Sequence, residues 1–178
     1  MALPRRTFLK TGAVVALALA AGGAIYRSNQ PASATYRFIL DGEARAAIDA
    51  IVAAMLGGAL PQGEARASAI TRATQQVHQA ILGLPLATQE EIADLFGLLA
   101  LAPARRFLAG VPDGWASAST EQVGAFLQAW RLHRFAMLQV AYHALHDLVL
   151  GAWYADPSAW AAIGYPGPRM ELSTELSA

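Results

Sequence analysis

The chain has 178 residues, no cysteine, and 13 basic against 13 acidic side chains, so its formal net charge is zero. Without cysteine it can form no disulfide, no thiolate-held iron–sulfur cluster, no covalently attached c-type haem and no cysteine nucleophile. Most of the redox centres that an exported protein could carry are therefore excluded.

The N-terminus has the layout of a twin-arginine export signal. An apolar stretch, residues 12–25, follows a basic motif made of Arg5, Arg6, Phe8, Leu9 and Lys10. A charged region followed by a short apolar region is typical of a secretory signal. The apolar stretch is about 14 residues long, whereas a membrane-spanning helix needs ~20.

A small-residue cleavage pattern follows the apolar stretch, with Ala32 and Ala34 on either side of Ser33. We therefore expect residues 1–34 to be a twin-arginine signal peptide and the protein to be exported to the periplasm. The alternative is a signal that is kept as a membrane anchor.

The signal holds four of the 13 basic residues and none of the acidic ones, so residues 35–178 carry nine basic and 13 acidic side chains. This acidic balance does not suggest a nucleic-acid partner or an anionic membrane surface.

The remaining chain shows helical spacing of its apolar residues throughout, which predicts an all-α bundle of four or five helices over residues 35–152. The first helix is expected to begin after an N-cap at Asp41, and the second covers about 64–82. Thr88 and Glu91 form a capping-box pattern for the third helix, which should end before Pro103. A short extra turn is expected near residues 105–108.

The longest helix is expected to begin at a capping box made by Ser119 and Gln122 and to run to about Gly151. Its first half is amphipathic. Its second half is apolar nearly all round, through Leu132, Phe135, Met137, Leu138, Val140, Tyr142, Leu145, Leu148, Val149 and Leu150. Such a helix is central to a core or covered by a partner, and both readings are compatible with the sequence.

Residues 153–178 are expected to form an irregular aromatic and proline-rich arm, because prolines stop a continuing helix. The arm either packs on its own bundle or reaches into another protein, since tryptophan and tyrosine often anchor interfaces. Its candidate partner-binding residues are Trp153, Tyr154, Asp156, Trp160, Tyr165, Pro166 and Pro168.

Three more candidates lie on the predicted long helix. Helical stepping places Trp130 and Arg134 on its inward stripe, next to Arg131. A buried arginine needs a partner, either in an internal ion pair with Asp94 or Asp147 or on another subunit. We expect these three residues to contact a partner.

No catalytic or cofactor-binding residue is predicted, because no nucleophile elbow and no phosphate-binding glycine loop is present. His143 and His146 lie three residues apart on one helix, but His133 is roughly 15 Å from His143 along that helix. His78 belongs to another helix. Core or interface histidines are therefore expected, and a periplasmic metal- or ligand-binding protein that uses His143 and His146 is the alternative function.

Several of these features together resemble one family. They are the twin-arginine signal, the cysteine-free helical body, and the segments 126–131, 153–157 and 160–168. They resemble gluconate 2-dehydrogenase subunit 3, the small or gamma subunit of bacterial periplasmic flavin dehydrogenases. Only Ser158 and Ala159 separate the Asp-Pro pair from Trp160, where family members have an insert, so the chain looks like a shorter subgroup.

The resemblance implies a non-catalytic accessory subunit. Such a subunit binds a large FAD-dependent dehydrogenase of the glucose–methanol–choline class, which acts on a sugar or an alcohol. It supports the maturation of that dehydrogenase and carries it through the twin-arginine translocase. A cytochrome c subunit often completes the complex.

Overall fold

A computed structural model describes residues 38–160 and 164–167 of the chain. Several predicted features lie outside these residues. They are the export motif with Arg5, Arg6, Phe8, Leu9 and Lys10, the cleavage residues Ala32 and Ala34, and Pro168 of the predicted arm.

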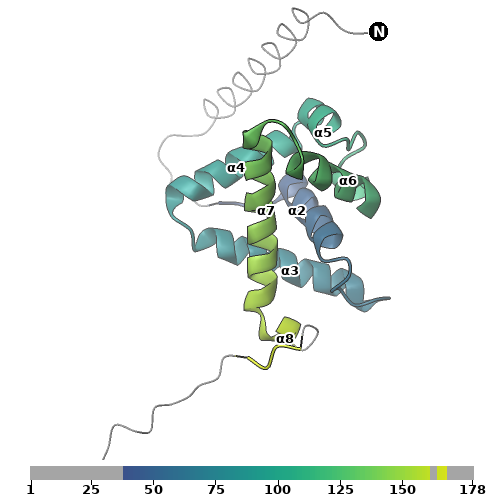
Figure 1. The fold of residues 1–178 in the computed structure, drawn as a ribbon, viewed down its shortest axis with the longest axis vertical. Coiled ribbons are helices and arrows are strands. Elements are labelled where there is room, and N and C mark those ends of the chain that lie inside the picture. Colours follow the sequence, from purple (N-terminus) through teal and green to yellow (C-terminus); the bar gives the residue numbers. More distant parts are fainter. Residues whose placement is uncertain (1–37, 161–163, 168–178) are drawn as a thin grey trace, which may run out of the picture.

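The described residues form seven α-helices and one 3₁₀-helix, and they contain no strand, so the prediction of an all-α fold is confirmed (Figure 1). The expected number of four or five helices is too low, because the predicted long helix is two helices and the short helices α5 and α8 add to the bundle. The helices are α2 (Gly42–Met55), α3 (Ala65–Leu82), α4 (Leu86–Ala100), α5 (Ala102–Leu108), η1 (Trp115–Ser117), α6 (Thr120–Arg131), α7 (Ala136–Ala155) and α8 (Pro157–Trp160). None of the described helices is long and apolar enough to cross a membrane.

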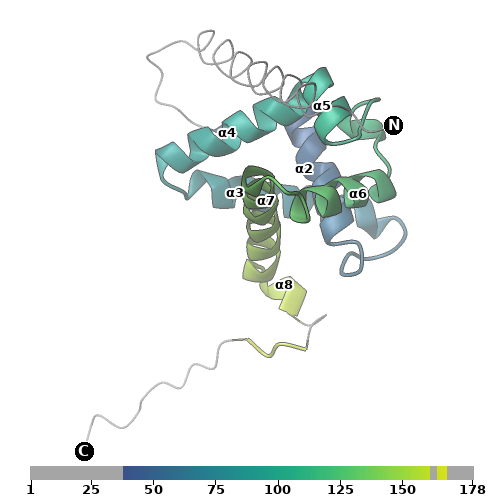
Figure 2. The same ribbon diagram turned by 45° about the horizontal axis from the view of Figure 1, so that its top comes forward.

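The centre of the bundle is α2, which contacts α3, α4, α6 and η1 (Figures 1 and 2). It buries residues one turn apart on one side, namely Ala47, Ile48, Ile51 and Val52. A short helix that is covered on several sides supplies much of the core, since each buried aliphatic side chain contributes about 1.5–3 kcal/mol relative to exposure.

The start of α4 differs from the prediction. The helix begins at Leu86 with Pro85 in the N-cap position, one turn earlier than a capping box at Thr88 would place it. The physical reason lies in Gln89, which is 5 % exposed and donates its side-chain amide to the carbonyls of Leu82 and Leu84. The end of α3 and the start of α4 are thus joined by one buried glutamine.

The capping box at the start of α6 is confirmed. The Ser119 hydroxyl accepts the backbone N–H of Gln122 at 3.2 Å, and the Gln122 side chain accepts the backbone N–H of Ser119 at 2.9 Å. The prediction of one long helix after this capping box is wrong. Two helices are found, because α6 ends at Arg131 and α7 begins at Ala136.

The break between α6 and α7 has a packing cause. A single helix over residues 120–155 would be roughly 54 Å long at 1.5 Å per residue. In the bundle, α6 packs on α2 while α7 crosses α3 in another direction (Figure 2). One straight helix cannot follow both directions, so the chain turns at residues 132–135.

The last turn of α7 contains Trp153 and Tyr154, so the irregular arm does not begin at residue 153 as predicted. After Asp156 the chain forms the short helix α8, and residues 164–167 then pack against its last residue. The ring of Trp160 makes an edge contact with Tyr165, and its indole N–H donates to the Tyr154 carbonyl at 2.8 Å.

Candidate partner-binding surface

Four large hydrophobic side chains are exposed where α6 turns into α7. Their exposed fractions are 77 % for Leu132, 54 % for Phe135, 70 % for Met137 and 65 % for Val140. We call residues 131–140 the α6–α7 corner. Large hydrophobic side chains that are exposed close together in a folded chain are candidates for an interaction site.

The backbone of the α6–α7 corner is held by its own side chains. The Phe135 N–H donates to Nδ1 of His133 at 3.1 Å, and the Gln139 side chain donates to the His133 carbonyl at 2.7 Å. These bonds replace intrahelical partners that the break removes, and they hold the turn between α6 and α7.

Two arginines flank the hydrophobic side chains of the corner. Arg131 and Arg134 are both exposed, and the Arg134 guanidinium carbon lies 4.8 Å from the centre of the Phe135 ring. The expectation that Arg134 faces inward is therefore wrong. It rested on an unbroken helix, and the turn at 132–135 rotates this residue onto the surface.

Trp130 lies inward, as helical stepping predicts, and is 1 % exposed. Its indole N–H donates to the Leu108 carbonyl at 3.0 Å, and its ring contacts Phe126 edge-on with 4.7 Å between centroids. Its side chain belongs to the core of the bundle, directly under the start of the corner.

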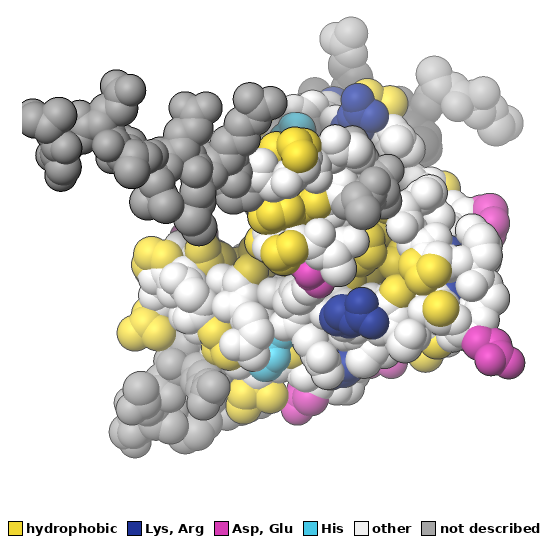
Figure 3. Space-filling view, turned by 90° about the horizontal axis from the view of Figure 1, so that it is seen from below, with side chains coloured by type: hydrophobic (Ala, Val, Ile, Leu, Met, Phe, Trp, Pro, Cys, Tyr) yellow, Lys and Arg dark blue, Asp and Glu magenta, His cyan; other side chains and the backbone are white. Residues whose placement is uncertain are grey.

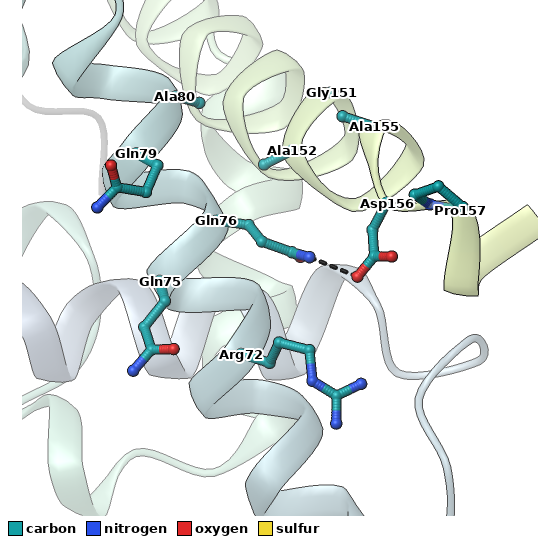
Figure 4. Close-up of a pocket in the computed structure, with 10 residues that line it drawn as sticks. All are labelled: Arg72, Gln75, Gln76, Gln79, Ala80, Gly151, Ala152, Ala155, Asp156 and Pro157. Carbon is teal, nitrogen blue, oxygen red and sulfur yellow. Dashed lines mark hydrogen bonds between the residues drawn. The ribbon is translucent and has the colours of Figure 1, made fainter.

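A second candidate surface is a groove of about 610 Å³ between α3 and the end of α7 (Figure 4). One wall carries Arg72, Gln75, Gln76 and Gln79 of α3, and the other is made of small residues of α7. The Gln76 amide donates to the Asp156 carboxylate across the groove. Figure 3 views this end of the molecule and shows hydrophobic side chains in several places, with basic side chains close to the middle of the view.

Asp156 also accepts the backbone N–H of Ser158 at 2.8 Å. The bonds from Ser158 and then the bond from Gln76 hold the pKa of the Asp156 carboxyl below its usual value. The predicted partner-binding residues of this region have different degrees of exposure: Trp153, Asp156 and Trp160 are half-buried, while Tyr154, Tyr165 and Pro166 are exposed.

The histidines do not gather at one place. His78 lies 3.3 Å from the Phe38 carbonyl, His133 lies in the corner, and Nδ1 of His146 is 3.0 Å from the Asp147 carboxylate. His143 and His146 both contact the Tyr142 ring. Within residues 38–160 and 164–167, no group of three or more histidine, aspartate or glutamate side chains could hold a metal ion.

The sequence reasoning missed that four residues, Leu132, Phe135, Met137 and Val140, would be exposed together. It assigned them to a long helix that is apolar on nearly every side. Helical spacing could have identified two of them, Met137 and Val140, as exposed. The buried residues of α7 are Leu145, Val149 and Ala152, and their stripe, continued toward the N-terminus, reaches Leu138 and leaves Met137 and Val140 outside it.

Comparisons with known proteins add no relative: no family model matches the chain, and searches of curated proteins and of solved structures find no match either.

Proposed function

We propose that this chain is the non-catalytic small subunit of a periplasmic flavin-dependent dehydrogenase, of the gluconate 2-dehydrogenase subunit 3 type. In this role it binds the large FAD-containing subunit in the cytoplasm, supports its maturation and carries it through the twin-arginine translocase. A cytochrome c subunit is a further candidate member of the complex.

The observation that carries the proposal is the exposed hydrophobic α6–α7 corner. Leu132, Phe135 and Met137 are each more than half exposed although the bundle has a well-buried core of its own. A folded domain that leaves such side chains in water gains free energy when another protein covers them, at about 25 cal/mol per Å² of apolar surface.

The twin-arginine pattern at Arg5 and Arg6 supports the carrier part of the proposal. A signal of this kind is an address read by a receptor, and it is not part of the folded domain. One signal therefore suffices for two chains if the domain behind it holds the second chain firmly during export.

The test is export of the partner from cells that express both chains. Replacing Arg5→Lys together with Arg6→Lys should leave the dehydrogenase in the cytoplasm, measured by its flavin and its activity in separated cytoplasmic and periplasmic fractions. Arg27→Lys is the matched control, since it makes the same chemical change within residues 1–34 but outside the pair. A dehydrogenase that still reaches the periplasm in the double variant would contradict the carrier role.

A further inference from the structure

We propose that the α6–α7 corner is the surface that docks on the large dehydrogenase subunit, and that the matching patch of that subunit is an apolar surface edged by carboxylates. This inference rests on the proposed function, and it names the surface and the chemistry that the proposed function leaves open.

The composition of the corner fits a protein interface. Interface cores are enriched in aromatic residues, methionine and arginine, and they are depleted in lysine and acidic residues. The corner presents Phe135, Met137 and two arginines within a few residues of one another. Arginines and large aromatic residues are also the side chains that most often dominate binding energy.

The charge of the corner specifies the partner patch. Arg131 and Arg134 are exposed beside the hydrophobic side chains. A partner surface with carboxylates around an apolar centre is complementary to this arrangement, and complementary charge speeds association and excludes wrong partners.

The rigidity of the corner favours a protein over a lipid surface. The bond from the Phe135 N–H to His133 and the bond from Gln139 to the His133 carbonyl fix the turn, and the Arg134 guanidinium rests against the Phe135 ring. Side chains that are already ordered lose little entropy when they meet a surface of fixed shape. A fluid lipid surface adapts to the side chains that enter it, so it has no need of a fixed turn.

The groove between α3 and α7 is the competing surface. It lacks the exposed aromatic and methionine side chains and the pair of arginines that the corner has. Its α3 wall consists mainly of glutamine side chains, and its α7 wall consists of Gly151, Ala152 and Ala155. Its one arginine, Arg72, lies beside Asp156, which partly offsets its charge. The groove therefore provides control positions on the same molecule.

The experiment measures how much flavin-containing large subunit co-purifies with the tagged full chain. We expect Phe135→Ser, Met137→Ser and Arg134→Glu each to weaken the complex by about tenfold or more, the range of a dominant interface residue. The matched controls are Leu86→Ser, an exposed hydrophobic position on α4, and Arg72→Glu in the groove, and both should leave the yield unchanged. Circular dichroism and thermal unfolding confirm that every variant is folded.

A photocrosslinking residue placed at Met137, with Gln75 as the control position, tests direct contact. A crosslink from position 137 to the flavin-containing subunit supports the inference. A crosslink to a second copy of this chain overturns it, and so does sedimentation of the chain with phosphatidylglycerol vesicles that Phe135→Ser abolishes.

The two proposals fail in distinguishable ways. If the wild-type chain brings the flavoprotein with it and the corner variants bring as much, the docking surface is elsewhere and only this inference is wrong. If the wild-type chain brings no flavoprotein, the proposed function is wrong and the inference falls with it.

Discussion

Two buried tryptophans serve both as core side chains and as caps of helix ends. Trp115 donates its indole N–H to the Leu99 carbonyl at 2.9 Å, and Trp130 donates to the Leu108 carbonyl at 3.0 Å. Leu99 and Leu108 lie in the last turns of α4 and α5, where carbonyls have no intrahelical partner. Phe126 makes edge contacts with both indole rings, so one aromatic cluster joins α4, α5, η1 and α6.

At the residue scale, Trp130→Phe should lower the free energy of unfolding by about 1–3 kcal/mol, because it leaves the part-buried Leu108 carbonyl without its indole donor. Urea unfolding at neutral pH measures the change. Trp160→Phe is the matched control, since Trp160 is only half-buried and its loss should have a smaller effect. Equal losses in the two variants would contradict this role of Trp130.

At the element scale, the structure distinguishes two capping patterns that look alike in sequence. Ser119 forms its capping box, whereas Thr88 lies inside α4 after the helix has begun at Leu86. The buried Gln89 bonds to the end of α3, and it fixes the start of α4 where no capping residue exists. A capping-box pattern in the sequence predicts where a helix begins only when no tertiary contact fixes the start of that helix elsewhere.

Ser119→Ala should therefore cost about 1 kcal/mol of stability, the usual effect of losing an N-cap. Thr88→Ala should have no such cost, because alanine is the better helix former within a helix. Thermal unfolding of both variants checks the contrast, and a larger loss of stability for Thr88→Ala would mean that Thr88 caps α4.

The junction of α7 and α8 gives a pH-dependent prediction. The bonds from Ser158 and Gln76 lower the pKa of Asp156 from the ordinary value of 3.8. A carboxyl whose pKa is lower in the native than in the unfolded state stabilises the protein above its unfolded pKa, and this stabilisation is lost as the pH falls through the native pKa.

The melting temperature of Asp156→Asn should thus lie below that of the wild type at neutral pH. The difference should shrink as the pH falls below 3.8 toward the native pKa, because protonated Asp156 resembles asparagine. Scanning calorimetry over this range measures it. A difference that stays constant with pH would mean that the carboxylate charge does not matter.

At the scale of the whole molecule, the C-terminal segment, which is α8 with residues 164–167, contacts the bundle mainly through α7. The central helix α2 joins most of the other elements, whereas α8 contacts α7. The hydrophobic corner lies at the start of α7, and the groove, α8 and residues 164–167 lie at its other end (Figure 1). Val140, the last residue of the corner, and Gly151, the first α7 residue of the groove, are thus roughly 17 Å apart along the helix.

Truncation after Ala155 should leave a folded bundle that still co-purifies with the large subunit, because the corner and the core residues of α2 to α7 are retained. Circular dichroism reports folding, and the flavin absorbance of the purified complex reports binding. A folded truncation that binds no flavoprotein would move the docking surface to the C-terminal segment.

The sequence by itself determined the helical class, the bounds of α3 to within a residue and the capping box of α6. Each of these depends on residues close together in the chain: apolar spacing, a stop at Gly83, and the pair Ser119 and Gln122. Only the tertiary structure decided the turn at 132–135, where no glycine or proline marks a break. Because α6 packs on α2 and α7 on α3, the chain must change direction there, and this turn exposes Arg134, Phe135 and Met137.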